Sequence, residues 1–345
     1  MLSDDVIGWD IGGAHLKAAR IGASGVVLDA VQVPCALWRG LRELEHGIEA
    51  VLTRCVGVQY HAITMTGEMV DLFPDRGAGV KAIAEYVAKR LGDDVVWLYR
   101  GDGQFVPPYQ AAEYAMQIAS ANWHAAAECV AQKIGNGILV DIGSTTTDII
   151  PIVANKLRNQ GGDDATRLVT DELVYSGVVR TPLMAMTERV PFAGTSVPLM
   201  AEYFATMADV YRLTGELPEH ADQHPAADGG EKNLAASGRR LARMLGRDRD
   251  SAPMTDWHEL ARWFRGRQLA RLHAACEHVA ASAQMPADAP IIGAGVGRFL
   301  IRELAAVTAR PYRSFADLLP LAEVTADEVS NLAPAVSVAL LWQRR

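Results

Sequence analysis

Short apolar runs alternate with longer amphipathic stretches along this chain, a pattern typical of an α/β fold. In the first half, the pattern predicts strands at residues 6–9, 16–21, 25–33, 61–65 and 95–99. Helical spacing predicts helices at residues 41–56, 79–91 and 111–134, the last ending before Gly135. We therefore expect a three-stranded meander followed by alternating helices and strands.

The second half is expected to be mainly helical. The predicted helices are residues 198–213, 237–244, 258–283, 298–309 and 326–343, with a strand at 290–293, and the last helix is expected to pack back on the first domain. Residues 217–232 are polar. His220 and His224 would lie one turn apart as metal ligands if this segment were helical, but the prolines and the glycine pair within it favour an exposed loop.

A motif near the beginning of the chain returns near its middle. Residues 8–21 read GWDIGGAHLKAARI, and residues 140–152 read VDIGSTTTDIIPI. The copies align at an offset of 131 positions and match Asp10 with Asp141, Gly12 with Gly143, and Lys17 with Asp148. Each copy is a strand, an Asp-x-Gly turn and a second strand. This repeat predicts two related domains, although unrelated hairpins can share Asp and Gly because both are common turn residues.

Length and composition agree with two domains. Of 345 residues, 50% are hydrophobic and 21% are charged, which excludes wholesale disorder. The net charge of −8, without a long basic run, argues against nucleic-acid binding by phosphate neutralisation. No apolar stretch reaches 18 residues, and the first five residues are too polar to begin a signal peptide. The four widely spaced cysteines fit reduced thiols, so we expect a cytoplasmic protein without a membrane partner.

The two Asp-x-Gly turns carry residues suited to a phosphate ligand. Glycine lacks a side chain, so the backbone N–H groups of Gly12, Gly13 and Gly143 could approach an anion closely. The second turn adds the hydroxyls of Ser144, Thr145, Thr146 and Thr147, and Lys17 would supply a positive charge. Ionised carboxylates such as those of Asp10, Asp141 and Asp148 bind phosphate through Mg²⁺ and its waters. For either turn alone, a purely turn-forming role is the simpler interpretation.

A third glycine-rich segment lies near the end of the chain. Residues 291–299 read IIGAGVGRF, which predicts a strand, a turn with Gly293, Gly295 and Gly297, and a helix whose N-terminus could meet a phosphate or nucleobase. The spacing G-x-G-x-G departs from the G-x-G-x-x-G of dinucleotide-binding proteins. The chain also lacks a P-loop, a G-x-S-x-G elbow and an H-E-x-x-H motif.

In combination, the three segments resemble the sugar kinase/Hsp70/actin superfamily. That resemblance implies an α/β, ribonuclease H-like, actin-like ATPase fold with two domains and an interdomain cleft, two phosphate loops facing each other, and an adenosine loop at residues 291–297. It divides the chain into a first domain of residues 1–134 plus 325–345 and a second of residues 135–324. The helices at 111–134 and 326–341 would cross between them.

Two further segments narrow the resemblance to the hydantoinase/oxoprolinase branch. DIGSTTTDI is similar to its D-x-G-[GS]-T-x-T-D stretch, and residues 175–182, YSGVVRTP, resemble the [TS]-G-x-x-R-T-P segment of a small group within it. Residues 65–73, MTGEMVDLF, resemble that group's T-x-E-L-x-D, with Met69 in place of leucine. The group is tied to tetrahydromethanopterin-linked one-carbon metabolism. Its characterised activity is a synthase of methanofuran-type cofactors, a transferase that joins an aminomethyl-furfuryl diphosphate to the phenol of (glutamyl)tyramine.

The resemblance assigns expected roles to the candidate residues. Asp10, Asp141 and Asp148 would hold Mg²⁺ with the leaving diphosphate, assisted by Lys17 and Arg180, although Arg180 could instead clamp a carbonyl or carboxylate. The base that accepts the phenol proton would be Glu68 or Asp10.

The expected partners are small-molecule substrates, and ATP is a less favoured cofactor. The oligomeric state is open, with a homodimer as one candidate. An ATP-dependent kinase or amidohydrolase, and a non-catalytic nucleotide-binding protein, are the alternatives. The chain lacks the long extension of hydantoinases and oxoprolinases, which argues against ATP-driven ring opening.

Overall fold

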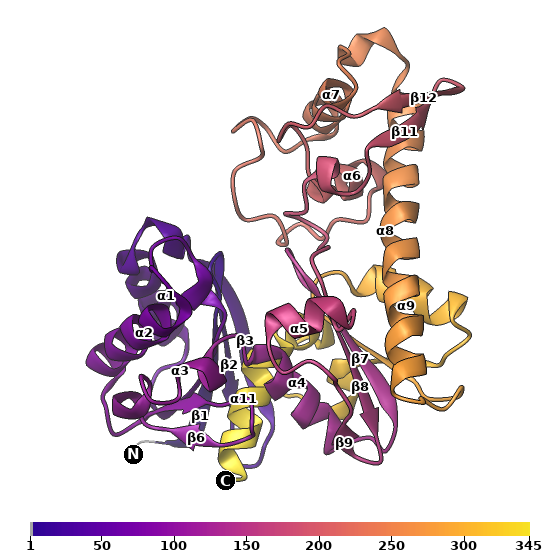
Figure 1. The fold of residues 1–345 in the computed structure, drawn as a ribbon. Helices are drawn as coiled ribbons and strands as arrows, with labels where there is room; N and C mark the ends of the chain where they lie inside the picture. The colour runs from indigo at the N-terminus through magenta and orange to yellow at the C-terminus, as the bar shows by residue number, and fades with distance from the viewer. Residues whose placement is uncertain (1–2) are drawn as a thin grey trace. The chain divides into compact units, whose positions relative to one another are not determined.

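The computed structural model describes residues 3–345 and divides the chain into two compact units (Figure 1). Unit 1 comprises Met1–Leu139, Ile150–Arg167 and Arg313–Arg345, and unit 2 comprises Val140–Ile149 and Leu168–Tyr312. Unit 1 is thus assembled from three stretches of the chain, including both ends of the sequence. The division runs through the strands of the second sheet. The domain limits expected from the repeat stay a prediction.

Unit 1 is built on a six-stranded sheet in the order β3-β2-β1-β4-β5-β6. Its strands are β1 (Ser3–Ile11), β2 (His15–Ile21), β3 (Val27–Pro34), β4 (Val58–Met65), β5 (Val96–Tyr99) and β6 (Phe105–Val106). The first three strands form the predicted antiparallel meander, and β4 and β5 continue parallel to β1. A parallel strand needs a crossover connection, and α2 (Arg76–Leu91) supplies the one between β4 and β5.

Helices cover both faces of this sheet. Ile7 and Ile11 share an apolar core with α1 (Leu41–Arg54) and with α2. Side chains alternate along a strand, so Gly8 and Asp10 lie on the opposite face, where α11 (Ala333–Gln343, yellow in Figure 1) contacts β1, β2 and β4. The predicted packing of the last helix on the first domain is confirmed.

Glycine at position 8 allows the closest approach of helix and sheet in unit 1. A Cβ at Gly8 would lie 1.9 Å from the carbonyl oxygen of Ala335 and 2.8 Å from the Cβ of Ala339. Any side chain at this position would therefore push α11 away from β1.

The remaining helices of unit 1 include a correction. The predicted helix at 111–134 is two short helices, α3 (Ala115–Ile118) and α4 (Asn122–Ala131), because Ser120 adopts a left-handed backbone with φ 51°. The predicted helix at 326–343 is likewise divided into α10 (Ala326–Asn331) and α11, since Pro334 lacks an N–H donor and cannot lie inside a continuous helix. The unit also contains α5 (Asp164–Val169), strand β9 (Lys156–Leu157), and the short 3₁₀ segments η1 (Leu37–Arg39), η2 (Gly67–Met69), η3 (Pro108–Gln110) and η6 (Phe315–Leu318).

Unit 2 contains the second copy of the repeated motif and most of the helices in the second half of the chain. The second sheet has the order β10-β8-β7-β13-β14, with β9 paired to β8. Its strands are β7 (Gly137–Ile142), β8 (Thr147–Val153), β10 (Leu173–Val174), β13 (Ile291–Ala294) and β14 (Tyr312–Ser314). The strand–turn–strand order of β7 and β8 repeats that of β1 and β2, as the sequence repeat predicts.

The long helix α8 (Met254–Ser282, orange in Figure 1) contacts three other helices and one strand of unit 2. These are α6 (Met207–Thr214), α7 (Leu234–Met244), α9 (Arg298–Val307) and strand β11 (Arg189–Phe192), which pairs with β12 (Thr195–Pro198). Two short 3₁₀ segments, η4 (Leu183–Ala185) and η5 (Arg249–Ser251), complete the unit. The predicted helix at 198–213 begins only at Met207, because Thr206 and Asp209 form a capping box there.

Candidate active site

An acidic and a basic side chain form an ion pair beside the first Asp-x-Gly turn. Asp10 lies near the end of β1 and is 2% exposed, and its register partner on β2 is Lys17. The ammonium nitrogen Nζ of Lys17 lies 3.3 Å from Oδ2 of Asp10. The alternation of strand residues thus brings both predicted site residues to one face of the sheet.

The other carboxylate oxygen of Asp10 has no partner. Oδ1 is buried and has no hydrogen-bond partner, and neither does Oγ1 of Thr64, the register partner of Asp10 on β4. An unsatisfied buried acceptor costs about 1–3 kcal/mol, and more if it is charged. An oxygen ligand in this state fits a Mg²⁺ ion, which prefers carboxylate oxygen.

The turn itself is closed by backbone hydrogen bonds. The N–H of Gly12 donates to the carbonyl of His15 at 3.0 Å, so this group closes the turn. The N–H of Thr66 donates to the carbonyl of Ile11 at 2.9 Å, which holds the segment that follows β4 against the turn. A Cβ at Gly13 would lie 2.7 Å from Cγ1 of Val70, so a larger residue would displace this neighbouring segment.

Glu68 follows directly on that segment, in η2, and is 1% exposed. Its Oε1 accepts a hydrogen bond of 2.9 Å from the hydroxyl of Ser120, while Oε2 is buried without a partner. Burial raises the pKa of Glu68, which Ser120 and the guanidinium of Arg76 lower in part. A carboxylate of raised pKa is the stronger base once it is ionised.

The second turn has the same closure. The N–H of Gly143 donates to the carbonyl of Thr146 at 2.9 Å. Ser144 Oγ and Thr145 Oγ1 form a hydrogen bond of 3.4 Å, and residues 143–146 are partly exposed. Thr147 is fully buried, and its hydroxyl donates to the carbonyl of Ser176 at 2.7 Å. The Thr147 hydroxyl is therefore buried and bound within the fold, whereas Ser144, Thr145 and Thr146 are partly exposed.

The predicted segment at residues 175–182 packs on this turn. The N–H groups of Val178 and Arg180 donate to the carbonyls of Gly143 and Ser144 at 3.1 and 2.8 Å. A Cβ at Gly177 would lie 2.4 Å from the backbone of Ser144, so only glycine permits this approach. The Arg180 side chain is exposed.

The glycine-rich loop packs on the same turn. The N–H of Gly297 donates to the carbonyl of Ile142 at 2.9 Å, and Gly295 has a φ of 81°. A Cβ at Gly295 would lie 2.3 Å from Oδ1 of Asp141, so the loop backbone lies directly against this carboxylate. Gly293 packs under the ring of Tyr312, where a Cβ would lie 2.6 Å from it.

The two turns share their surroundings as well as their sequence. At the offset of 131 positions, the bond from Gly12 to His15 corresponds to that from Gly143 to Thr146. The bonds from Thr66 to Ile11 and from Leu37 to Gly13 correspond to those from Gly297 to Ile142 and from Arg180 to Ser144. Three backbone hydrogen bonds are thus reproduced, which shows a structural repeat rather than a chance match of Asp-Ile-Gly.

The candidate residues divide between the units. Asp10, Gly12, Gly13, Lys17 and Glu68 belong to unit 1, and the others belong to unit 2: Asp141, Gly143, Ser144, Thr145, Thr146, Thr147, Asp148, Arg180, Gly293, Gly295 and Gly297. Among residues 3–345, no group of three or more His, Cys, Asp or Glu side chains is placed to hold a metal ion.

The sequence analysis missed several residues around these candidates. Ser120 and Asp164 contact the neighbourhood of Glu68, and the fully buried Gln268 of α8 donates to Ser176 Oγ and the Gly177 carbonyl at 2.9 and 3.0 Å. They are isolated polar residues in otherwise ordinary helix or turn sequences. No spacing rule distinguishes them from exposed polar residues.

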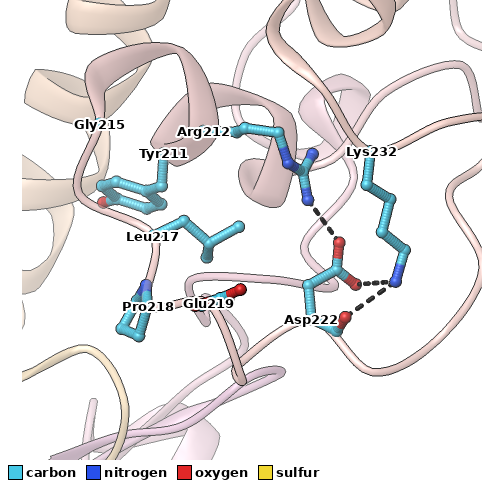
Figure 2. A pocket seen from close by; sticks show the side chains of 8 residues that line it. All are labelled: Tyr211, Arg212, Gly215, Leu217, Pro218, Glu219, Asp222 and Lys232. Atoms are coloured by element: carbon cyan, nitrogen blue, oxygen red, sulfur yellow. Dashed lines mark hydrogen bonds and ion pairs between the residues drawn. The ribbon is translucent and has the colours of Figure 1, made fainter.

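A separate pocket of about 320 Å³ lies in unit 2 beside the polar segment 217–232. Figure 2 shows Asp222 between Arg212 and Lys232, bound to both. The charged walls of this pocket thus neutralise each other, and none of the predicted site residues lines it. Residues 217–232 contain no helix, which confirms the loop prediction.

The profile of the hydantoinase/oxoprolinase family matches residues 59–307. The chain belongs to the hydantoinase/oxoprolinase family. The match includes Glu68, the second turn, the segment at 175–182 and the glycine-rich loop.

Curated members with similar sequences carry a single name, (4-{4-[2-(gamma-L-glutamylamino)ethyl]phenoxymethyl}furan-2-yl)methanamine synthase. The protein of Methanocaldococcus jannaschii is 32% identical over 246 residues, which cover 71% of this chain and 72% of that protein. The protein of Methanococcus vannielii is 38% identical over 120 residues, covering 34% of this chain and 54% of that protein.

The fold is also found in solved structures. Acetone carboxylase in a nucleotide-free form superposes with a TM-score of 0.53 at 10% identity, over 85% of this chain and 66% of that one. The predicted α/β fold of the actin-like class is confirmed. In this hydantoinase/oxoprolinase-family protein, no helix within residues 3–345 is both long and apolar enough to span a membrane.

Proposed function

We propose that this protein is a synthase of methanofuran-type cofactor biosynthesis, an aryl-ether-forming transferase that acts on small molecules. The observation that carries the proposal is the similarity to the Methanocaldococcus jannaschii synthase, at 32% identity over 71% of this chain. The name of that enzyme describes a product in which a phenol oxygen is joined to the CH₂ of a furan-2-yl-methanamine.

The product defines the bond that must form. The phenol oxygen of γ-glutamyl-tyramine attacks the furfuryl CH₂, and the carbon–oxygen bond to a diphosphate leaving group breaks. The diphosphate departs with the bonding electrons, and the phenol proton passes to a carboxylate. Because the furan ring stabilises positive charge at the carbon, the chief task of the protein is to stabilise the leaving diphosphate.

The polar groups of the two turns are suited to that task. Lys17 and Arg180 are the cationic candidates, and Ser144, Thr145 and Thr146 are the hydroxyl donors. We include Mg²⁺ in the proposal, with Asp10, Asp141 and Asp148 as ligands, because it would neutralise charge on the diphosphate. The unpartnered Oδ1 of Asp10 supports this assignment.

Glu68 is the preferred base for the phenol proton. Each candidate has one buried carboxylate oxygen without a partner, but Asp10 forms an ion pair with Lys17, whereas burial raises the pKa of Glu68. An unperturbed phenol has a pKa of about 10, so it needs such a base at neutral pH.

The test is to incubate the protein with the furfuryl diphosphate, tyramine or γ-glutamyl-tyramine, and Mg²⁺, in the absence of ATP. Ether product and diphosphate in equal amounts are expected. Glu68→Gln should lower kcat by about 10²–10⁴-fold, the usual contribution of a general base. The matched control is Glu85→Gln, an exposed carboxylate on α2 that should leave kcat unchanged.

Other outcomes would replace the proposal. ATP turnover stimulated by a substrate, without ether formation, would indicate a kinase or amidohydrolase. Tight nucleotide binding in calorimetry without any product would indicate a binding protein.

A further inference from the structure

A single hydroxyl lies between two buried carboxylates in unit 1. Ser120 Oγ is 2.9 Å from Oε1 of Glu68 and 3.2 Å from Oδ2 of Asp164. The exposed fractions of the three residues are 7%, 1% and 9%. Ser120 lies in the break between α3 and α4, Glu68 lies in η2, and Asp164 begins α5.

The Ser120 hydroxyl has too few hydrogens to donate to both carboxylates. A serine hydroxyl carries one hydrogen, and an ionised carboxylate only accepts hydrogen bonds. Ser120 can therefore donate to Glu68 or to Asp164, but not to both. Whichever carboxylate Ser120 does not serve must find another donor or carry a proton itself.

The two carboxylates differ in what else they contact. Asp164 Oδ2 also accepts a charge-assisted hydrogen bond of 2.8 Å from Nη2 of Arg76. Glu68 accepts no hydrogen bond from a charged side chain: Ser120 and its own backbone N–H are its donors, and its Oε2 is buried and unpartnered. The proton of this pair therefore belongs on Glu68, and its exchange takes place there.

The backbone at Ser120 is built for this position. Its φ of 51° lies in the left-handed region, which costs a non-glycine residue about 1–2 kcal/mol. The strain interrupts what would otherwise be a continuous helix and directs the hydroxyl at the two carboxylates.

We propose that Ser120 and Asp164 are positioning residues for Glu68, and that the Ser120 hydroxyl switches between the carboxylates as Glu68 gains and loses the substrate proton. The proposal rests on the proposed function. While Glu68 is ionised, Ser120 donates to its Oε1. When Glu68 takes the phenol proton on Oε2, Ser120 turns to Asp164. One proton moves from oxygen to oxygen, and no electron is transferred.

The charged groups that act on Glu68 are Arg76 from α2 and Asp164 from α5. Asp164 raises the pKa of Glu68 by like-charge repulsion, and Arg76 lowers it by attraction. The other neighbours are neutral: Met69 within η2, Ser120, and the backbone of Gly79, where a Cβ would lie 2.5 Å from the Glu68 carbonyl.

Two substitutions should move the acidic limb of the pH–kcat profile in opposite directions. Asp164→Asn removes a repelling charge and releases Arg76, so the limb should shift to lower pH by about one unit. Ser120→Ala removes the donor to ionised Glu68, so the limb should shift to higher pH by a similar amount. KM should change little in either variant, because neither residue is proposed to contact substrate.

A structural role would produce a different result. If both residues only hold the fold, stability and kcat fall but the limb stays in place, and the proposal is wrong. Ser120→Gly separates the two effects, because glycine adopts a positive φ without strain. It should restore the stability lost in Ser120→Ala while keeping the shifted limb.

A measurement without substrate distinguishes this proposal from the proposed function. Burial opposes ionisation of Glu68, so folding binds a proton above the unfolded-state pKa of 4.5, and stability is lost as pH rises beyond it. Urea unfolding should show that Glu68→Gln removes this loss and that Asp164→Asn reduces it, with Glu85→Gln as the control.

If Glu68→Gln leaves the pH dependence of stability unchanged, the switching hydroxyl is refuted whatever the enzyme assay gives. If the pH dependence changes as expected but no ether is formed, the Ser120 hydrogen-bond switch stands and the proposed reaction fails.

Discussion

Two histidines in unit 1, His61, which is buried, and His124, which is half-buried, make the stability of the unit depend on pH. Trp9 Nε1 donates to Nδ1 of His61 at 3.2 Å, and Nδ1 of His124 is hydrogen-bonded to the Tyr99 hydroxyl at 2.8 Å. Burial lowers the pKa of each histidine to about 4, so both are neutral at physiological pH.

The consequence is acid sensitivity in a defined window. An unfolded histidine takes up a proton below pH 6.5, whereas the folded one resists until about pH 4, so stability falls as pH falls through this range. Each histidine contributes at most about 1.4 kcal/mol per pH unit. His61→Gln, whose carbonyl can still accept from Trp9, should reduce the slope measured by urea unfolding. His46→Gln, on the exposed side of α1, should leave the slope as it was.

For single residues of the candidate site, the sequence predicts some of the contacts and misses others. Asp10 and Lys17 were both assigned to the first turn from sequence, and the strand register then places them opposite each other. Glu68 was found through its motif. Ser120 and Asp164 were not, because their contact with Glu68 depends on the break between α3 and α4, which a run of good helix formers conceals.

Among the elements, the segment at residues 175–182 shows how irregular backbone is held in place. Gln268 of α8 donates to Ser176 Oγ and to the Gly177 carbonyl, and it accepts from the Tyr211 hydroxyl. A segment without regular structure needs such partners, because its own polar groups form no ladder.

Replacing Gln268 tests this brace. Gln268→Leu leaves the buried polar groups of Ser176, Gly177 and Tyr211 without their partner, and we expect a loss of about 2–4 kcal/mol in the free energy of unfolding. The control is Gly266→Ala in the same helix, where an added Cβ meets no atom within 4 Å. This substitution should raise the free energy of unfolding by about 0.5–1 kcal/mol. Equal stability of Gln268→Leu and the wild type would contradict the assigned role.

Element boundaries were the part of the fold least accessible from sequence. Helices with strong periodicity, such as α2 and α9, were placed within a few residues. The helix predicted at 198–213 was wrong in its first half, because β12 ends at Pro198 and a loop follows it up to the N-cap at Thr206.

For the whole molecule, the contact between the first strand and the last helix is a sharp test of unit 1. Gly8→Val would place side-chain atoms where the Ala335 carbonyl and the Ala339 methyl now lie. We expect a loss of about 3 kcal/mol or more, since overpacking of this kind forces the backbone to move. Gly135→Ala, where a Cβ meets nothing within 4 Å, is the matched control and should cost little. Both are measured by urea unfolding followed by tryptophan fluorescence.

The repeat made the overall plan predictable, whereas the composition did not. Two copies of one strand–turn–strand motif, with a glycine-rich loop near the end of the chain, resemble a known superfamily, and that resemblance implied the fold class. The equivalent hydrogen bonds that Thr66 and Gly297 donate to the ends of the two strands could not be predicted, because the local sequences around these residues do not resemble each other. Such contacts follow from the three-dimensional repeat alone.

The position of α11 also has a consequence for how the protein is made. Unit 1 needs residues 313–345 to complete its core, yet the ribosome makes them only after unit 2. For most of translation, the face of β1 around Gly8 lacks its covering helix and exposes apolar surface. Unit 2, between these segments, can gain its structure earlier. The sheet of unit 1 can thus complete its core only once α11 has been synthesised.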